Sequence, residues 1–129
     1  MPDGKKAWRI GRDGEVRTKK LLESENFFCI RSDVDSQGVD ILAFKDGEIY
    51  LIEVKATSVE KKSPNTVFGL KQRKKYFYFK RKMENNGFKV NLILFYWYKK
   101  FKNGKQKRNW SLDIIKYDGL NDYEVVDYI

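Results

Sequence analysis

The stretch that most constrains how this chain can fold runs from residue 38 to residue 57. Two apolar runs rich in β-branched residues flank Asp46-Gly47, a dipeptide typical of two-residue type I′ turns. We therefore predict a β-hairpin in which Asp40 lies directly opposite Glu53, at a pair whose side chains are close together. The paired residues between them are apolar on both faces, which is typical of strands that are covered on both sides.

The polar end of this hairpin combines two carboxylates and an ammonium group. Lys55 projects from the same face as Glu53, because side chains alternate along a strand. Carboxylates about 4.5–5.5 Å apart repel each other unless a cation lies between them. A plain salt bridge from Lys55 is one explanation, but it leaves the other carboxylate, that of Asp40, beside a like charge. A divalent-metal site with a lysine over the reacting water accounts for all three residues.

Composition limits the chemistry that such a site can use. The chain has no histidine, and Cys29 is its only cysteine, so zinc fingers, iron–sulfur clusters, histidine bases and Ser/His/Asp triads are excluded. Any metal must be held by oxygen ligands, which favours Mg²⁺, with Mn²⁺ as a substitute. We expect no small-molecule cofactor.

The charge balance indicates the class of partner. Among 129 residues, 27 are Lys or Arg and 18 are Asp or Glu, which leaves a formal charge of +9. This excess predicts a polyanionic partner, nucleic acid before membrane. The sequence contains neither an apolar run of about 18 residues nor an apolar N-terminal signal segment. We expect a single domain over 1–129, in an intracellular protein with a buried Cys29 thiol.

The remaining elements follow from periodicity and turn signals. We predict helices over about 5–24 and 71–85, and strands over 27–31, 88–101 and 109–117 besides the hairpin. Residues 66–70 form a strand or a lead-in to the second helix, Asn103-Gly104 marks another turn, and the acidic tail 120–129 is left unassigned. This order predicts an α/β fold with a mixed central β-sheet of about five strands flanked by α-helices.

Two glycines stand on the inner side of the first predicted helix. Gly11 and Gly14 each cost about 1 kcal/mol of helix propensity relative to alanine. A frayed N-terminal turn would explain them. We favour a close approach of the helix to another backbone, which would deliver Glu15 to the hairpin site.

The set Glu15, Asp40, Glu53 and Lys55 resembles the signature of the PD-(D/E)XK nuclease superfamily. Within it, the chain is most similar to the archaeal-type Holliday junction resolvases. The matching segments are a Gly-x₃-Glu helix at 11–15, an Arg…Ser…Gly…Asp-Ile pattern at Arg31, Ser36, Gly38 and 40–41, and an Ile-Glu-Val-Lys strand at 52–55.

The match also has departures. Val16 stands where these resolvases usually have an arginine. Gln72 and Tyr76 fit the Gln-x₃-Tyr element of RecB-like nucleases, in which a helix follows the active-site strand.

The resemblance implies a restriction-endonuclease-like core and metal-assisted hydrolysis of a phosphodiester bond. Asp40 and Glu53 would coordinate Mg²⁺, together with the Val54 carbonyl. Glu15 would support a second ion or the water around the first. Lys55 would orient the attacking water or help to deprotonate it.

The implied substrate is branched DNA. The resemblance also implies a homodimer, because a four-way junction needs two cuts. Candidate DNA contacts share a basic or polar side chain outside the hairpin core: Arg12, Arg17, Lys19, Ser36, Lys71, Gln72, Arg73, Lys74, Lys75, Lys105 and Lys107. Two alternatives stay open. One is a RecB-like or restriction-like nuclease that cuts duplex or single strands, and the other is a non-catalytic DNA-binding protein with the same fold.

Overall fold

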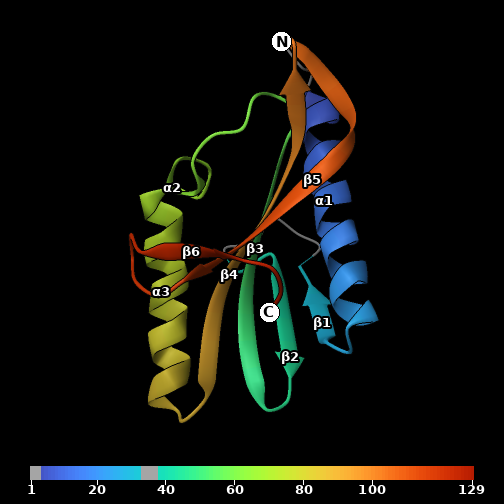
Figure 1. The fold of residues 1–129 in the computed structure, drawn as a ribbon. Helices are drawn as coiled ribbons and strands as arrows, with labels where there is room; N and C mark the ends of the chain where they lie inside the picture. Colours follow the sequence, from blue (N-terminus) through green and yellow to red (C-terminus); the bar gives the residue numbers. More distant parts are fainter. Residues whose placement is uncertain (1–3, 33–37) are drawn as a thin grey trace.

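A computed structural model describes residues 4–32 and 38–129. Its helices are α1 (Gly4–Ser24), α2 (Pro64–Val67) and α3 (Leu70–Asn85). Its strands are β1 (Phe28–Arg31), β2 (Ile41–Lys45), β3 (Glu48–Thr57), β4 (Lys89–Lys102), β5 (Lys105–Tyr117) and β6 (Tyr123–Val126). The strands form one sheet in the order β1-β2-β3-β4-β5-β6, with α1 on one face and α3 on the other (Figure 1).

The predicted central hairpin is present in the predicted register. β2 and β3 are antiparallel and pair Ile41 with Ile52 at the end away from the turn. Asp46 and Gly47 have φ values of 51° and 80°, the positive sign that a type I′ turn requires. Asp40 comes one residue before β2, so this register places it opposite Glu53.

The sheet is mixed, as predicted. β3 and β4 are parallel, and the crossover between them contains α2 and α3, whereas every other neighbouring pair is antiparallel. The sheet has six strands rather than about five, because the acidic tail supplies β6 at the edge beside β5. The prediction of an α/β fold with helices flanking a mixed sheet is confirmed.

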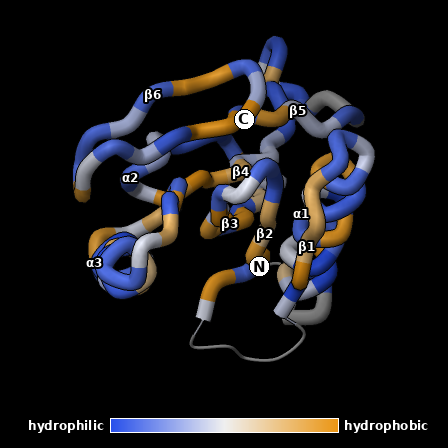
Figure 2. Tube along the Cα trace, turned by 90° about the horizontal axis from the view of Figure 1, so that it is seen from below, coloured by the Kyte–Doolittle hydropathy of each residue, from blue (hydrophilic) through white to orange (hydrophobic). Residues whose placement is uncertain are grey.

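An apolar core lies on each face of the sheet, since the central strands are buried from both sides. Figure 2 shows hydrophobic stretches of these strands between α1 and α3. The core under α1 contains Leu22, Cys29, Ile41, Ile52 and Phe95 among its buried members. The core under α3 contains Leu51, Phe68, Tyr76, Leu94 and Tyr96. The Cys29 thiol is free and buried, and burial raises its pKa.

The two glycines of α1 have different surroundings. A methyl group at Gly14 would lie 3.2 Å from the Ala56 Cβ and 3.4 Å from a Val54 methyl group. The helix thus approaches β3 closely at Gly14, although the atoms it meets belong to side chains and not to a backbone as we predicted. The predicted close approach is wrong for Gly11, where an added methyl group would have no neighbour within 4 Å.

Of the two alternatives predicted for residues 66–70, a strand or a lead-in to the second helix, the structure has the lead-in. Residues 66–70 do not pair with any strand among the described residues; instead, α2 begins at Pro64, and α3 follows from Leu70. Proline is favoured in the first turn of a helix, where its missing N–H has no partner to lose. The residues before α3 thus form a short helix of their own.

β4 and β5 continue beyond the rest of the sheet as a two-stranded arm. Pairing of β3 with β4 ends at Thr57 and Tyr98, whereas β4 runs on to Lys102 and turns through Asn103 and Gly104 into β5. We call residues 99–110 the arm. It projects past the end of β3 in Figure 1. No helix within the described ranges is long and apolar enough to cross a membrane.

Candidate active site

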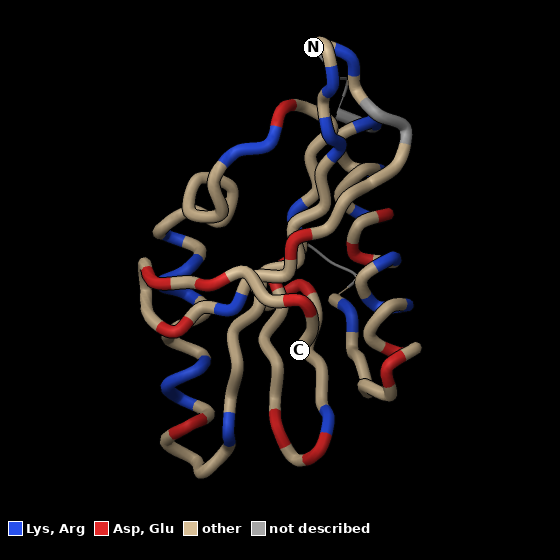
Figure 3. The backbone as a smooth tube through the Cα atoms, viewed as in Figure 1, with Lys and Arg blue, Asp and Glu red and all other residues tan. Residues whose placement is uncertain are grey.

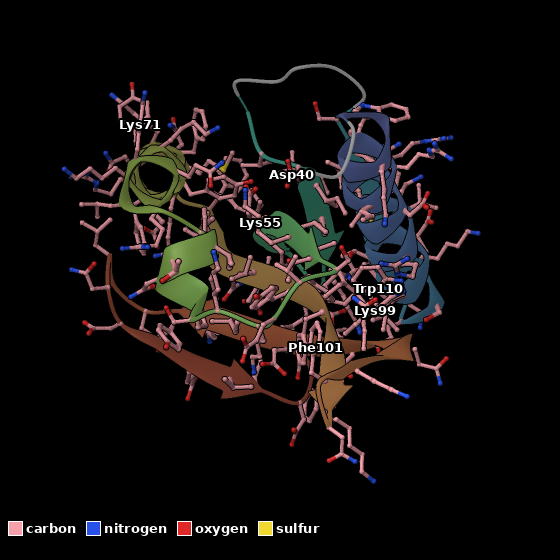
Figure 4. The ribbon with its side chains drawn as sticks, turned by 90° about the horizontal axis from the view of Figure 1, so that it is seen from above. Asp40, Lys55, Lys71, Lys99, Phe101 and Trp110 are labelled. Carbon is pink, nitrogen blue, oxygen red and sulfur yellow. The ribbon has the colours of Figure 1, made fainter. Side chains whose placement is uncertain are left out.

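The carboxylates of the central hairpin lie at the end of the sheet between α1 and α3. Glu53 is a β3 residue with a side chain only 7% exposed, and Asp40 enters from the segment before β2. The Lys55 Nζ lies 3.6 Å from the Glu53 Oε1. Figure 4 shows Asp40 and Lys55 close together in this space, with Lys71 farther out on α3. The structure thus groups Asp40, Glu53 and Lys55 as the hairpin register predicts.

Backbone and side-chain hydrogen bonds hold Asp40 in place. The Val54 N–H donates to the Asp40 Oδ2 at 2.9 Å, beyond the last rung of the β2–β3 ladder. The Asp40 N–H donates to the Tyr76 hydroxyl at 3.1 Å, and the Asp40 carbonyl accepts from the Ser32 N–H at 3.0 Å. The position of this carboxylate therefore depends on β1, β3 and α3 together.

Glu53 lies in an environment that opposes its ionisation. Burial, followed by the nearby charge of Asp40, raises the pKa of Glu53 to about 8, although Lys55 acts in the opposite direction. Burial also raises the pKa of the Tyr76 hydroxyl, and the charge of Glu53 adds to this effect. A cation between the two carboxylates would relieve both the repulsion and the cost of burial.

The donor set fits a hard divalent cation only in part. Two adjacent carboxylates with a largely buried oxygen are ligands that Mg²⁺ and Mn²⁺ prefer. Within the described part of the chain, no group of three or more acidic, histidine or cysteine side chains is close enough to hold a metal. The residues present therefore supply two protein ligands, and the other positions would belong to backbone oxygen, water or substrate.

Among the described residues, Glu15, Asp40 and Glu53 do not form a group of three that could hold a metal, and support of a second ion or of the water around the first stays a prediction for Glu15. Its Oε1 lies 3.4 Å from the Arg31 Nε. Arg31 pairs with Ile41 across β1 and β2, next to Asp40 in the chain. Helix α1 therefore brings Glu15 to the border of the site, where its carboxylate pairs with the Arg31 guanidinium.

The basic residues predicted on α1 have distinct surroundings. Arg12 is exposed, with its guanidinium carbon 5.6 Å from the centre of the Trp8 ring. The Lys19 Nζ lies 3.8 Å from the Glu23 Oε2. Arg17 is packed between two indoles, with its guanidinium carbon 4.8 Å from the ring centres of Trp97 and Trp110. Its Nε and Nη2 are buried without a hydrogen-bond partner among the described residues.

Arg17 therefore braces α1 against the arm instead of presenting an open charge. Burial lowers the pKa of its guanidinium, and Asp13 opposes this shift. A direct role in binding phosphate stays a prediction for Arg12 and Lys19, and the environment of Arg17 argues for packing.

Arg73 on α3 is a correction to the predicted DNA contacts. Its side chain is 4% exposed, and its guanidinium donates to the carbonyl oxygens of Leu120 at 2.8 Å, Asn65 at 2.9 Å and Phe68. It also donates to the Asn121 side chain at 3.1 Å. Arg73 thus ties α3 to the loops around it and cannot reach a DNA backbone.

The neighbours of Arg73 remain available in different degrees. Lys71 and Lys74 are exposed, and Gln72 is half-buried. Lys75 donates from its Nζ to the Gly38 carbonyl at 3.2 Å, which places this ammonium beside the segment that leads to Asp40. Figure 3 shows Lys and Arg along α3, whereas acidic residues gather around β6.

Three predicted contacts lie on the arm or in the loop before β2. The Lys105 side chain is exposed at the end of the arm. Ser36 lies outside the described residues, and so does the side chain of Lys107. Their predicted contacts with DNA stay predictions.

Tyr76 and Arg31 have site contacts that the sequence reasoning did not assign. Gln72 and Tyr76 stood out as a Gln-x₃-Tyr pattern, but that pattern does not reveal that the Tyr76 hydroxyl would reach the Asp40 backbone. Arg31 appeared in the resolvase-like pattern without a role, and it now pairs with Glu15. A motif position can thus be found from sequence before its partner is known.

Comparison with known proteins supports the resemblance over part of the chain. No protein-family model matches. The crossover junction endodeoxyribonuclease Hjc of Methanocaldococcus jannaschii is 43% identical over 54 residues, which is 42% of this chain. The match spans 40% of that protein's length.

Among solved structures, the comparison finds Archaeoglobus fulgidus Hjc, described as a Holliday junction resolvase from an archaeal hyperthermophile. It is 19% identical, with a TM-score of 0.49, and the alignment covers 79% of this chain and 70% of that one. The sequence match alone confirms the similarity to archaeal-type resolvases, and the segment of 54 residues is homologous to part of an archaeal Hjc.

Proposed function

We propose that this protein is a metal-dependent endonuclease that cleaves four-way DNA junctions. The observation that carries the proposal is the grouping of Asp40, Glu53 and Lys55 at one end of the central hairpin, with the Lys55 Nζ 3.6 Å from the Glu53 Oε1. Homology of a 54-residue segment to a crossover junction endodeoxyribonuclease supports the choice of substrate. The formal charge of +9 suits a nucleic-acid partner.

In this proposal Asp40 and Glu53 hold the metal, Mg²⁺ or Mn²⁺. When bound there, the ion supplies Lewis-acid stabilisation of the phosphate charge and lowers the pKa of the attacking water. The Val54 N–H and the Tyr76 hydroxyl orient Asp40 through its carboxylate and its backbone N–H, respectively. Lys55 stands on the Glu53 side, where its ammonium orients the water and offsets negative charge on the phosphate.

Glu15 acts in this proposal through Arg31. The ion pair between them, at 3.4 Å, fixes an arginine beside the metal-binding end of β2. A cation in that position suits a contact with a phosphate next to the one that is cleaved. Glu15 is thus a supporting residue, and a second metal ion is not needed to explain it.

The exposed lysines of α3 and the arm hold the DNA backbone without reading its bases. Contacts of this kind fix the position of the duplex and carry little sequence information. A homodimer is part of the proposal because a symmetric junction has two equivalent strands to cut.

A second candidate function is favoured by one contact. The hydrogen bond between the Tyr76 hydroxyl and the Asp40 backbone gives the Gln-x₃-Tyr pattern a place in the site. This pattern is typical of RecB-like nucleases, which cut duplex or single strands.

Cleavage assays test the proposed chemistry. A labelled four-way junction is incubated with the protein in Mg²⁺, in Mn²⁺ and in a chelator, beside the Asp40→Asn variant. We expect cleavage only with metal and only by the unchanged protein. Equal cleavage in chelator, or by Asp40→Asn, would remove the metal-site interpretation, and binding without any cleavage would leave a DNA-binding protein.

A further inference from the structure

An exposed aromatic side chain lies near the tip of the arm. Phe101 is 44% exposed near the end of β4. It makes no ring-to-ring or cation–π contact with the described residues. Residues 99–108 contain six basic residues and no acidic one. Aromatic side chains interleaved with cations are typical of surfaces that stack on the bases and hold the backbone of nucleic acids.

The base of the arm is fixed from both sides. On the α1 side, Arg17 lies between Trp97 and Trp110, and the Lys99 Nζ lies 4.9 Å from the centre of the Trp110 ring. Lys99 and Trp110 lie together beside α1 in Figure 4.

On the opposite side, the arm is held by the loop after β3. The Gln106 side chain donates to the Ser58 carbonyl, and the Lys61 Nζ lies 2.6 Å from the Asp113 Oδ2. The Lys61 ammonium also lies 4.6 Å from the Tyr98 ring centre. These contacts on both sides hold the arm in a defined direction relative to the sheet.

The register relates Phe101 to the active site. Lys55 pairs with Tyr96 across β3 and β4, and Phe101 comes five residues farther along β4. At about 3.3 Å per residue, the ring lies roughly 15 Å beyond Lys55 along the strand direction. This distance corresponds to about half a turn of duplex DNA, at roughly 3.4 Å per base step.

The ladder is irregular just before Phe101. Lys99 pairs with Trp110, whereas Phe101 pairs with Gln106, so β5 contains two more residues than β4 between these rungs. Such bulges bend and twist a hairpin and redirect its side chains. The irregularity lies between the Trp110 contacts at the base of the arm and the Gln106 contact beside Phe101.

We propose that Phe101 is a wedge that stacks on an unpaired or weakly stacked base at the branch point of the DNA. This inference rests on the proposed function for its substrate. Exposed Lys100, Lys102 and Lys105 bind the flanking phosphates, and the phenyl ring enters between bases, as apolar wedges do in proteins that kink DNA. A continuous duplex has no open base step, so the wedge favours branched DNA over linear DNA.

The test uses the full chain in chelator, where DNA is bound and not cut. A four-way junction carries 2-aminopurine next to the branch point, and its fluorescence reports how that base is stacked. We expect the unchanged protein to alter this signal, Phe101→Ala to abolish the change and Phe101→Trp to retain it. Loss of one stacked base predicts about fivefold to a hundredfold weaker junction binding by Phe101→Ala. Binding to linear duplex should be unchanged.

Phe88→Ala is the matched control, because Phe88 is an exposed phenylalanine beside the opposite end of β4. It should behave like the unchanged protein. The wedge would be overturned if Phe101→Ala gave the same 2-aminopurine signal and the same junction affinity as the unchanged protein. It would also be overturned if the substitution changed the oligomeric state but not the signal. These results are independent of cleavage. A wedge signal without any metal-dependent cutting would instead contradict the proposed function and leave the wedge standing.

Discussion

Glu53 shows how a single residue can make a site dependent on its ligand. Its carboxyl group is buried next to Asp40, and its pKa rises to about 8 from an ordinary value of 4.5. Without a cation, the Glu53 carboxyl keeps its proton at neutral pH in the folded protein, whereas in the unfolded chain it is already ionised at that pH. Burial of this residue therefore lowers the free energy of unfolding at neutral pH, and it favours binding of a cation beside the carboxylate.

The first prediction concerns stability against pH in chelator. Below about pH 4.5 the Glu53 carboxyl is protonated in both states and contributes nothing. Between about pH 4.5 and 8 the folded state binds more protons than the unfolded state, so the free energy of unfolding falls as pH rises. The loss is on the order of a few kcal/mol, and it levels off above about pH 8.

Denaturant titrations at several pH values measure this effect. Glu53→Gln should remove the decline, whereas Glu60→Gln, at an exposed position, should keep it. Addition of Mg²⁺ at pH 8 should restore stability to the unchanged protein. A pH dependence identical in Glu53→Gln and the unchanged protein would mean that the Glu53 carboxyl is not the buried proton site.

The second prediction concerns cleavage and binding by site variants. Asp40→Asn, Glu53→Gln and Lys55→Ala should each reduce junction cleavage by more than about a hundredfold. Asp40→Asn should keep or increase junction affinity in chelator, because it removes a negative charge that repels phosphate. Glu53→Gln should keep this affinity, because the Glu53 carboxyl already holds a proton near neutral pH in the absence of metal. Gel shifts and single-turnover rates separate the two effects. Normal cleavage by either carboxylate variant would be incompatible with a metal held by this pair.

At this scale, the sequence was most informative where local geometry decides the outcome. The turn at Asp46-Gly47 and the alternation of strand side chains suffice to place Asp40 opposite Glu53 and Lys55 on the same face. The environment of Glu15 depends on how α1 lies against β1, which no local rule specifies. Its contact with Arg31 was therefore not predicted.

Among the elements, α3 illustrates why a basic sequence is an incomplete guide to a binding surface. Seven of its residues are Lys or Arg, but Arg73 points into the protein and bonds to backbone carbonyl oxygens. Lys74, one position later, is exposed. Adjacent residues on a helix differ by about 100° in direction, so one can be structural and the next can bind phosphate.

The third prediction uses this adjacent pair. Arg73→Met should lower the free energy of unfolding by about 2–4 kcal/mol, because it leaves buried carbonyl oxygens without donors. Lys74→Ala should leave stability within about 0.5 kcal/mol and weaken DNA binding. Denaturant titrations and gel shifts on both variants measure the contrast. An Arg73→Met protein of normal stability that binds DNA poorly would restore Arg73 as a DNA contact.

The element boundaries depend on signals of unequal strength. The helix ending before Asn86-Gly87 and the turn at Asn103-Gly104 follow from positive φ angles that glycine and asparagine tolerate, and these were predicted. β6 was not assigned, although the short loop 118–122, which begins with Asp118-Gly119, joins it directly to β5. Its four residues are mostly exposed and show no apolar alternation. The short α2 was missed because four residues carry too little periodicity.

Over the whole molecule, positive charge and the arm determine how DNA can be held. Basic residues occur on α1, on α3 and on the arm, whereas the acidic tail folds against β5 (Figure 3). Charge collected in several separate places suits a branched substrate, in which more than one duplex contacts the protein.

The fourth prediction concerns salt. With contacts to about 6–10 phosphates, junction affinity should fall by about 10³–10⁵ between 50 and 200 mM salt. Replacement of Lys100, Lys102 and Lys105 by alanine should reduce the slope of log affinity against log salt by about 2–3. Fluorescence anisotropy titrations at several salt concentrations measure both values. A flat response would show that the positive surface does not bind nucleic acid.

The most direct measurement of the central claim is the rate of metal-dependent cleavage on a four-way junction compared with a linear duplex of the same sequence. The proposed function predicts at least about a tenfold preference for the junction, which is about 1.4 kcal/mol. It also predicts symmetric nicks in two opposed strands, with 5′-phosphate ends that a ligase can seal. Equal cutting of junction and duplex, or degradation that starts from DNA ends, would contradict the claim and favour a RecB-like nuclease.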